Sequence, residues 1–329
     1  MNKTVNTVIS GTGMALPETV LTNSDLEKIV ETSDEWIVSR TGIRERRKLE
    51  EGLSNVDLSE PAAREALERA AVKPSELDLI IVATVTPDHP TPSTSCLLQS
   101  RLNAEKAAAF DLSAGCSGFV YAVSVAHQFI STGAYKNVLV VGVEVLSRVT
   151  DWEDRSTCVL FGDGAGAVVL TAGEGERGII DFSIHSEGSG AGLLMIPGGG
   201  SAMPASQETL QNRLHFIKMN GNEIFKFAVK VVEDNLSLML KRNGYEASDL
   251  DHLFLHQANL RIIEHIRKKL KLSPEKVPMN IDRLGNTSSA TIPIAMHEEL
   301  IAGRIKSNNL VAMVAFGAGL TWGGMLMRW

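Results

Sequence analysis

The chain has 329 residues, of which 44% are hydrophobic and 22% charged, and it carries a net charge of −7 at pH 7. These values are typical of a globular protein with a large core, and the length allows one large domain or two average ones. The negative charge argues against nucleic acid as a partner, and no apolar run approaches the roughly 18 residues of a membrane span. Three cysteines are too few for a disulfide framework, so we expect free thiols and a cytoplasmic location.

The predicted elements alternate along the chain. Helices are predicted at 59–72, with Ser59 as N-cap and Pro61 in the first turn, and at 258–272. Strands are predicted where short, continuous apolar runs occur, at 77–85, 136–145, 166–171, 250–256 and 309–317. Continuous apolar runs indicate strands that are buried on both faces, as in a sheet covered by helices. The pattern therefore predicts an α/β layered fold.

The two halves of the chain resemble each other. The segment that begins at Ser75 matches the segment at Ser248, and the segment at Gly115 matches the segment at Gly285. We interpret this as an internal duplication, with one half over 1–180 and the other over 181–329. The match aligns Cys116 with Asn286, each expected at the N-terminus of the equivalent helix. His256 ends a predicted strand, so all three residues are expected at one end of a paired sheet system.

Each of these three residues has two interpretations. A lone cysteine in an apolar context is more often a packed side chain, which is how we interpret Cys96 and Cys158. Cys116 lies between two glycines before a predicted helix, whose N-terminus would favour the thiolate. His256 is either a core histidine or a base and hydrogen-bond donor. Asn286 is either an N-cap or a group that polarises a carbonyl.

The ordered motifs narrow this choice. The segments "TSDEWIVSRTGIRERR", "DLSAGCSGF", "DRSTCVLFGDGAGAVVL", "LHQANLRII", "DRLGNTSSA" and "FGAGLTWG" together resemble β-ketoacyl-acyl-carrier-protein synthase III of the thiolase-like superfamily. The resemblance covers essentially the whole chain. It implies an internally duplicated, five-layered α-β-α-β-α fold and a homodimer. The first half would carry the cysteine, and the second the histidine and asparagine.

The resemblance also implies the reaction, the initiating condensation of fatty acid synthesis. Cys116 would be acylated by an acyl-CoA, typically acetyl-CoA. Malonyl-acyl-carrier protein would then lose carbon dioxide and attack the acyl-cysteine to give a β-ketoacyl-carrier protein, without cofactor or metal. His256 and Asn286 would donate to the malonyl thioester oxygen. The backbone N–H groups of Cys116 and Ala318 would form the oxyanion hole, with Ala318 replacing a glycine of the usual "FGGG".

Further binding residues follow from the same motifs. Trp36, Arg40 and Arg155 match the positions that bind CoA, and Asn259 is expected to line the pantetheine channel. A basic cluster is expected to dock the acidic carrier protein, although cations at a helix C-terminus also complement the helix dipole. This cluster comprises Arg261, Arg267, Lys268, Lys269 and Lys271. Thr91 stands where some family members carry a phenylalanine that closes the acyl pocket, so we expect room for longer or branched primers.

Other functions stay open at this point. A specialised synthase of the same subfamily, making a polyketide, quinolone or biotin precursor, would share the same three residues. An acyl-thioester hydrolase would also use them, but would release free acid. A non-catalytic acyl-binding subunit would be expected to lack one of them. A thiolase would need a second cysteine in the "FGAG" loop, which has none.

Overall fold

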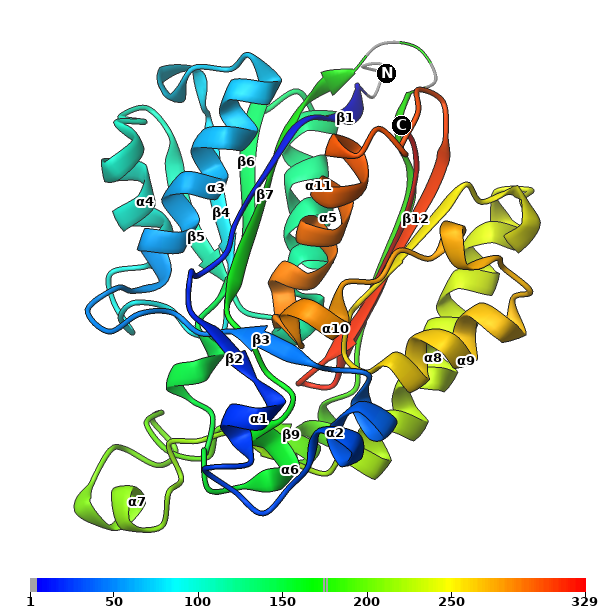
Figure 1. The fold of residues 1–329 in the computed structure, drawn as a ribbon. Helices are drawn as coiled ribbons and strands as arrows, with labels where there is room; N and C mark the ends of the chain where they lie inside the picture. Colours follow the sequence, from blue (N-terminus) through cyan, green and yellow to red (C-terminus); the bar gives the residue numbers. More distant parts are fainter. Residues whose placement is uncertain (1–4, 174, 176) are drawn as a thin grey trace.

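The computed structural model describes residues 5–173, 175 and 177–329. Within them, two larger sheets form the centre of the molecule (Figure 1). The first has the order β1-β7-β6-β4-β5 and the second the order β11-β12-β13-β8. The strands of the first are β1 (Asn6–Ala15), β4 (Leu79–Ala83), β5 (Ala108–Leu112), β6 (Asn137–Glu144) and β7 (Gly164–Gly173). Those of the second are β8 (Gly178–Ser186), β11 (His252–Leu255), β12 (Leu310–Gly317) and β13 (Thr321–Arg328).

Helices form three layers around these sheets, which confirms the predicted five-layered α/β fold (Figure 1). The central layer, between the sheets, contains α5 (Gly118–Ser131) and α11 (Thr291–Ile301). The outer face of the first sheet is covered by α3 (Asn55–Ala70) and α4 (Thr94–Leu102), and that of the second by α8 (Gly221–Arg242) and α9 (Leu260–Lys269).

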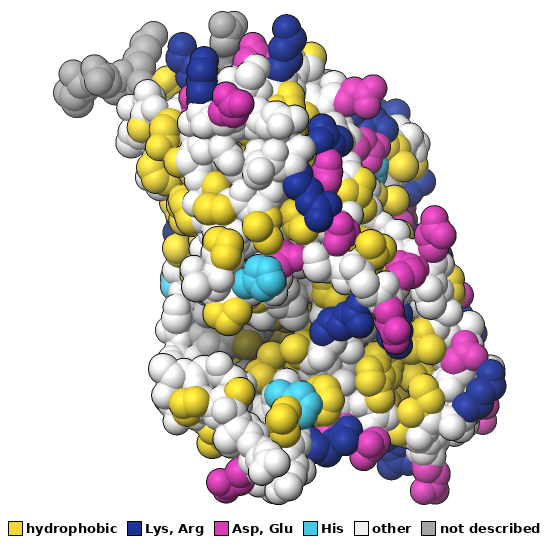
Figure 2. Space-filling model, turned by 90° about the vertical axis from the view of Figure 1, so that its left-hand side faces the viewer, with side chains coloured by type: hydrophobic (Ala, Val, Ile, Leu, Met, Phe, Trp, Pro, Cys, Tyr) yellow, Lys and Arg dark blue, Asp and Glu magenta, His cyan; other side chains and the backbone are white. Residues whose placement is uncertain are grey.

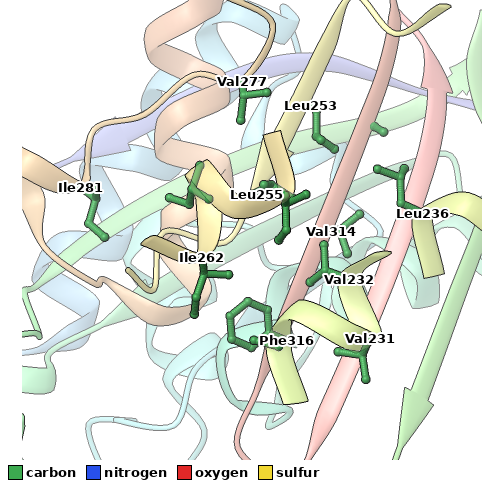
Figure 3. Close-up of a cluster of buried hydrophobic side chains, with 14 of the residues drawn as sticks. Val231, Val232, Leu236, Leu253, Leu255, Ile262, Val277, Ile281, Val314 and Phe316 are labelled. Atoms are coloured by element: carbon green, nitrogen blue, oxygen red, sulfur yellow. The ribbon is translucent and has the colours of Figure 1, made fainter. Parts of the chain in front are cut away.

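The outer layer of the second sheet shows why the predicted strands read as continuous apolar runs. Val232 and Leu236 of α8 and Ile262 of α9 pack against Leu255 and Val314 of β11 and β12 (Figure 3). Every residue of β11 and β12 is buried, as is every residue of β4. A strand covered by helices on both faces buries both sets of side chains, so period-2 alternation disappears.

The shorter elements lie mostly around the lower edge of the sheets (Figure 1). They are α1 (Asn23–Leu26), α2 (Asp34–Thr41), α6 (Arg155–Cys158), α7 (Gln207–Gln211), α10 (Ile281–Leu284), β2 (Val20–Thr22), β3 (Glu45–Arg47), β9 (Leu194–Met195) and β10 (Lys218–Met219). Two 3-10 turns, η2 (Gly115–Ser117) and η7 (Ser288–Ala290), precede the central helices. In the described part of the chain, every helix is too short or too polar to span a bilayer.

The topology repeats between the sheets, as the duplication predicts. Strand β4 runs parallel to β6, with Leu79 opposite Val138, and β11 runs parallel to β12, with His252 opposite Val311. In the first sheet, β7 is antiparallel to β6 and β1 is antiparallel to β7. In the second sheet, β13 is antiparallel to β12 and β8 is antiparallel to β13. The sheets therefore match at a constant offset of 173 residues (79 and 252, 138 and 311).

The same offset corrects the predicted partner of Cys116. It relates η2 to η7, and Gly115 and Ser288 share a left-handed backbone, with φ of 54° and 49°. The structural counterpart of Cys116 is therefore Ser289. Asn286 precedes the second turn, since the second half has three more residues between its Gly-Asn pair and its helix. The sequence match aligned Gly115 with Gly285 and therefore did not reveal this insertion.

Two predicted boundaries also change. Helix α3 begins at Asn55, because Ser54 and Asp57 form a capping box, so Ser59 and Pro61 lie inside the helix. The predicted division at 180/181 falls within β8, which begins at Gly178 and pairs with β13 of the second sheet. The division into two half-domains otherwise stays a prediction.

Candidate active site

A cavity of about 600 Å³ brings Cys116, His256 and Asn286 together, from three segments far apart in sequence. A second cavity of about 170 Å³ lies beside it. Its lining is mostly apolar and includes Leu146, Phe161 and Ala318. Cys116 lines both cavities. The thiol therefore stands where a long, partly polar ligand could approach from one side and a short apolar group could be held on the other.

Close backbone packing fixes the turn that carries Cys116. A Cβ added to Gly115 would lie 2.9 Å from the backbone N of Ala318, and one added to Gly317 would lie 2.6 Å from the backbone N of Cys116. Both positions thus need glycine. The Ser117 hydroxyl donates to Thr321 O at 3.0 Å, and the Thr321 hydroxyl lies 2.8 Å from Ala114 O. These contacts join the turn that carries Cys116 to the C-terminal glycine loop.

The thiol is not the preformed thiolate that the helix N-terminus predicts. The pKa of Cys116 is raised to about 12, mainly by burial and also by the neighbouring Glu144 carboxylate, while the Ser288 hydroxyl lowers it. Desolvation of the charged form is the largest of these effects. A proton must therefore leave the sulfur when it reacts.

His256 follows β11 and is buried, with an exposed fraction of 2%. Its Nδ1 lies 2.8 Å from the Thr291 hydroxyl, which is itself 2.9 Å from Ser288 O. The Phe316 ring meets the imidazole edge-on at 5.3 Å between centroids. Burial lowers the pKa of His256 to about 3, so the ring is neutral at pH 7. A neutral imidazole carries a proton on one nitrogen only, and the contact of Nδ1 with the Thr291 hydroxyl influences which tautomer His256 adopts.

Asn286 is held by its backbone and one side of its amide. Its N–H donates to Leu160 O at 2.9 Å, and its C=O accepts from the Gly162 N–H at 3.0 Å. Its Oδ1 accepts from the Ser288 N–H at 2.8 Å. With Oδ1 occupied, the Nδ2 group is the part left to face the cavity, which suits a hydrogen-bond donor.

Ala318 keeps an ordinary backbone. Its φ is not among the positive values found for non-glycine residues in the described part of the chain, so alanine causes no strain there. Among the described residues, the main-chain hydrogen bonds of loops, turns and caps do not use the N–H groups of Cys116 and Ala318. Two unpaired N–H groups beside a thiol are the elements of an oxyanion hole.

Comparison with known proteins agrees with this arrangement. Residues 110–188 match the family model described as 3-oxoacyl-[acyl-carrier-protein] synthase III, and residues 240–329 match its C-terminal model. A β-ketoacyl-[acyl-carrier-protein] synthase III of Caldanaerobacter subterraneus subsp. tengcongensis is 53% identical over 98% of this chain and 97% of that protein. The chain belongs to the 3-oxoacyl-[acyl-carrier-protein] synthase III family.

Solved structures place it in the same group. The synthase III of Aquifex aeolicus VF5 aligns with a TM-score of 0.91 at 49% identity, covering 98% of this chain and 100% of that one. The priming β-ketosynthase of the R1128 polyketide pathway aligns at 0.92 with 32% identity, covering 100% and 97%. As a synthase III, the protein is an acyltransferase, the initiating condensing enzyme of fatty acid synthesis with a thiolase-like fold.

The residues of this synthase that we predicted to bind CoA lie at the mouth of the larger cavity. The guanidinium of Arg40 stands 4.6 Å from the centre of the Trp36 ring, and that of Arg155 stands 4.9 Å from it. Asn259 caps α9, accepting from the Arg261 N–H at 2.8 Å and donating to Arg40 O at 3.1 Å. Trp36, Arg40 and Asn259 line the cavity, and Arg155 lines an adjoining hollow.

The predicted docking cluster is less free than its sequence indicates. Arg267 and Lys268 pair with Glu264 at 2.7 and 3.7 Å, and Lys269 pairs with Glu233 at 2.7 Å. Lys271 is exposed just beyond α9. Arg261 is exposed at the cavity mouth, where its guanidinium lies 5.7 Å from the centre of the Phe225 ring.

The role of Thr91 as a gate stays a prediction, because Thr91 is exposed and lines neither cavity of the single chain. The expectations about the cysteines can be compared with the structure directly. Cys96, expected to be packed, is exposed on α4, because the helix turns it toward solvent. Cys158 is buried, as expected.

Sequence reasoning missed Glu144, Ser288 and Thr291. Glu144 has one visible signal, a single carboxylate inside the apolar run "VVGVEVL". A charged residue in a fully buried strand needs partners that only the fold can supply. Ser288 and Thr291 carry no comparable signal, since serine and threonine are common near helix starts.

Proposed function

We propose that Cys116 is the nucleophile of two successive half-reactions. In the first, its sulfur attacks the thioester carbonyl of an acyl-CoA, typically acetyl-CoA, and CoA leaves. In the second, malonyl-carrier protein loses carbon dioxide, and the resulting enolate attacks the acyl-cysteine to give a β-ketoacyl-carrier protein. Because decarboxylation generates the carbanion, the reaction needs no cofactor. The observation that carries this proposal is the position of Cys116 at the junction of two cavities.

The electrostatics of the site support the remaining roles. The N–H groups of Cys116 and Ala318 would hold the oxyanion of each tetrahedral intermediate. Asn286 Nδ2 and a neutral His256 would donate to the malonyl thioester oxygen as charge builds there. For His256, this requires the proton on Nε2 and the Thr291 hydroxyl turned from Ser288 O toward Nδ1, a rotation about one bond.

The two cavities divide the substrate between them. The larger one, with Trp36, Arg40 and Arg155 at its mouth, suits the adenine and phosphates of CoA, through stacking and charge. Asn259 would lie along the pantetheine arm. The smaller, apolar cavity suits the primer, and its volume of about 170 Å³ favours a short acyl chain. The acceptance of longer or branched primers, expected from Thr91, can be measured with a series of acyl-CoAs.

Two protein partners are proposed. An acidic carrier protein would approach the cavity mouth over α9, where Arg261 is the cation most available to it, with Arg267, Lys268 and Lys269 behind. A second copy of the chain would pair at β5, the edge strand of the first sheet. Its Ala108 and Phe110 are exposed, and hydrophobic side chains are spread over that side of the molecule above a hollow (Figure 2).

The alternative within the family is a specialised priming synthase. It is favoured only by the likeness to the R1128 enzyme, at 32% identity against 49% for the Aquifex synthase. A hydrolase would use the same trio but would convert the acyl-cysteine to free acid.

Intact mass spectrometry tests the proposal. Mixing with acetyl-CoA is expected to add one acetyl group to the wild type and to Cys96→Ala, but none to Cys116→Ala. Adding malonyl-carrier protein is expected to clear the adduct with release of carbon dioxide and formation of acetoacetyl-carrier protein. Clearance as free acetate would favour the hydrolase, and a wild type without any adduct would contradict the proposal.

A further inference from the structure

Glu144 is a fully buried carboxyl group that the reaction above leaves without a role. It ends β6, with an exposed fraction of 0%, and in the described part of the chain it forms no ion pair with lysine or arginine. Its partners are neutral donors. The Thr86 and Thr84 hydroxyls lie at 2.6 and 3.2 Å from Oε2, and the Val85 N–H lies 3.1 Å from it. A buried carboxyl held this way can exist with or without its proton.

The other oxygen of Glu144 points to the nucleophile. Its Oε1 accepts from the Ser288 and Ser289 hydroxyls, each at 3.1 Å. Ser288 lines the smaller cavity together with Cys116, and its hydroxyl lowers the pKa of the thiol. A hydroxyl that donates to a carboxylate keeps lone pairs free to accept from a thiol. The three groups thus form one cluster, in which Ser288 shares a cavity with Cys116 and donates to Glu144 Oε1.

We propose that Glu144 receives the thiol proton of Cys116 through Ser288 during acylation and returns it after condensation. This inference rests on Cys116 being the nucleophile of the proposed function. In it, Glu144 is a positioning residue that stores a proton, because it reaches the sulfur only through Ser288.

The proton balance closes over the two half-reactions. In acylation, the bond from Cys116 Sγ to the acyl carbon forms and the bond from that carbon to the CoA sulfur breaks. The thiol proton passes to Ser288 Oγ, the proton of that hydroxyl passes to Glu144, and CoA thiolate takes a proton from solvent. In condensation, the enolate carbon displaces Cys116 as thiolate. Glu144 then returns its proton through Ser288, which restores the thiol and the carboxylate.

Glu144 suits this task better than His256 does. Burial raises the pKa of Glu144 to about 7, so near neutral pH it can both accept and release a proton. The low pKa of His256, about 3, makes that ring a weak acceptor. Among the described residues, the titratable group whose pKa the charge of Glu144 shifts is Cys116, on η2. The loop after β4 presents Thr84, Val85 and Thr86 to Glu144, and η7 presents Ser288 and Ser289.

A matched pair of buried carboxyls allows a controlled experiment. Asp163 is also 0% exposed, its pKa is also raised by burial, and it accepts from the N–H groups of Leu49 and Ser147 and from the Ser147 hydroxyl. It lines neither cavity. Glu144→Gln removes the proton store, Ser288→Gly breaks the path, and Asp163→Asn is the control. Glycine suits position 288 because φ there is 49°.

The first measurement is the rate at which iodoacetamide alkylates Cys116 between pH 6 and 9, followed by peptide mass, with exposed Cys96 as internal reference. This reaction uses no acyl-CoA, so it separates the inference from the proposed function. A proton relay predicts slower alkylation near pH 7.5 in both Glu144→Gln and Ser288→Gly, by about 100-fold, within the range of general base catalysis. Asp163→Asn should match the wild type.

A purely electrostatic or structural role gives a different result. The charge of Glu144 raises the pKa of Cys116, so its removal alone would make alkylation faster. Faster or unchanged alkylation in Glu144→Gln would overturn the proposal. If Glu144→Gln does not fold, Glu144→Asp takes its place, because the shorter side chain keeps the charge but draws the carboxylate away from Ser288. A relay then predicts slower alkylation, and unchanged or faster alkylation would overturn the proposal. In the second measurement, acetylation by acetyl-CoA should rise with pH through about 7 in the wild type and lose that rise in both variants.

Discussion

The turns η2 and η7, which precede the two central helices, share a backbone and differ in chemistry. Gly115 and Ser288 have nearly the same left-handed φ. In η2, Cys116 follows and lines both cavities, with Gly317 closely packed behind it. In η7, the counterpart Ser289 is 1% exposed, and its hydroxyl lies 2.8 Å from Ala83 O and 3.1 Å from Glu144 Oε1. One turn presents a thiol to the two cavities, and the other faces a buried acid.

The two halves also differ in the residues at the ends of the equivalent strands. At the offset of 173 residues, Ala83 at the end of β4 corresponds to His256 after β11, and Glu144 at the end of β6 corresponds to Gly317 at the end of β12. Turn η2 packs against β12, and η7 packs against β6. Gly317 therefore lies behind η2, and the larger Glu144 lies behind η7. The duplicated backbone has therefore been kept while the chemistry was divided between its copies.

The largest expected effect comes from moving the thiol between the two turns. Cys116→Ala should lower the rate of acetyl transfer by about 10⁴-fold or more, because no other group can form the thioester. The double variant Cys116→Ala/Ser289→Cys should not recover it, since position 289 faces Glu144 and not the cavity. Intact mass with acetyl-CoA checks both, and an adduct on the cysteine introduced at position 289 would show that the turns are interchangeable.

The next effect separates the half-reactions. Asn286→Ala should slow decarboxylation of malonyl-carrier protein by about 10²–10³-fold, which corresponds to roughly 3 kcal/mol of lost transition-state stabilisation. Acetylation of Cys116 should change far less, since its oxyanion is held by backbone N–H groups. Release of carbon dioxide and mass of the acetyl adduct measure the two steps on the same sample. Equal losses in both steps would contradict the division of roles.

A third test asks whether the space around η2 allows the side chain that η7 carries at the equivalent position. Gly115→Ser introduces the residue that the counterpart position, Ser288, tolerates at the same φ. Its Cβ would nevertheless lie 2.9 Å from the Ala318 backbone, so we expect a loss of about 1–3 kcal/mol in the free energy of unfolding. Urea unfolding measures it. Gly188→Ser is the control, because nothing lies within 4 Å of a Cβ there.

The smallest effect concerns the central helices. His127 of α5 meets the Thr7 hydroxyl at 2.8 Å, and His297 of α11 meets that of Thr12 at 2.9 Å. Burial lowers the pKa of both below the ordinary 6.5. As pH falls below 6.5, the unfolded chain binds protons that the folded histidines resist, so stability should fall toward acid pH.

Only His297 has a carboxylate partner among the described residues, Glu65 at 3.3 Å from Nε2. His127→Gln should therefore narrow the difference in Tm between pH 7.5 and 5.5 more than His297→Gln does. Thermal unfolding of the two variants at both pH values checks this. A larger narrowing in His297→Gln would mean that Glu65 does not compensate the charge.

The sequence by itself determined the layered α/β fold, the duplication and the family. Continuous apolar runs mark strands buried on both faces, and the motifs around Cys116, His256 and Asn286 are local patterns that a single chain displays. These features depend on neighbours in sequence, which is why "DLSAGCSGF" and "DRLGNTSSA" could be read directly.

Only the tertiary structure decided which residues meet. It made Ser289 the counterpart of Cys116, because an insertion of three residues is visible only in the backbone. It raised the pKa of the thiol that the helix start was expected to lower, because desolvation depends on the surrounding layers. It also brought Ser288, which shares a cavity with Cys116, into contact with Glu144, although Ser288 and Glu144 are 144 positions apart in the sequence. Burial and long-range contact are properties of the packed chain, and no local pattern encodes them.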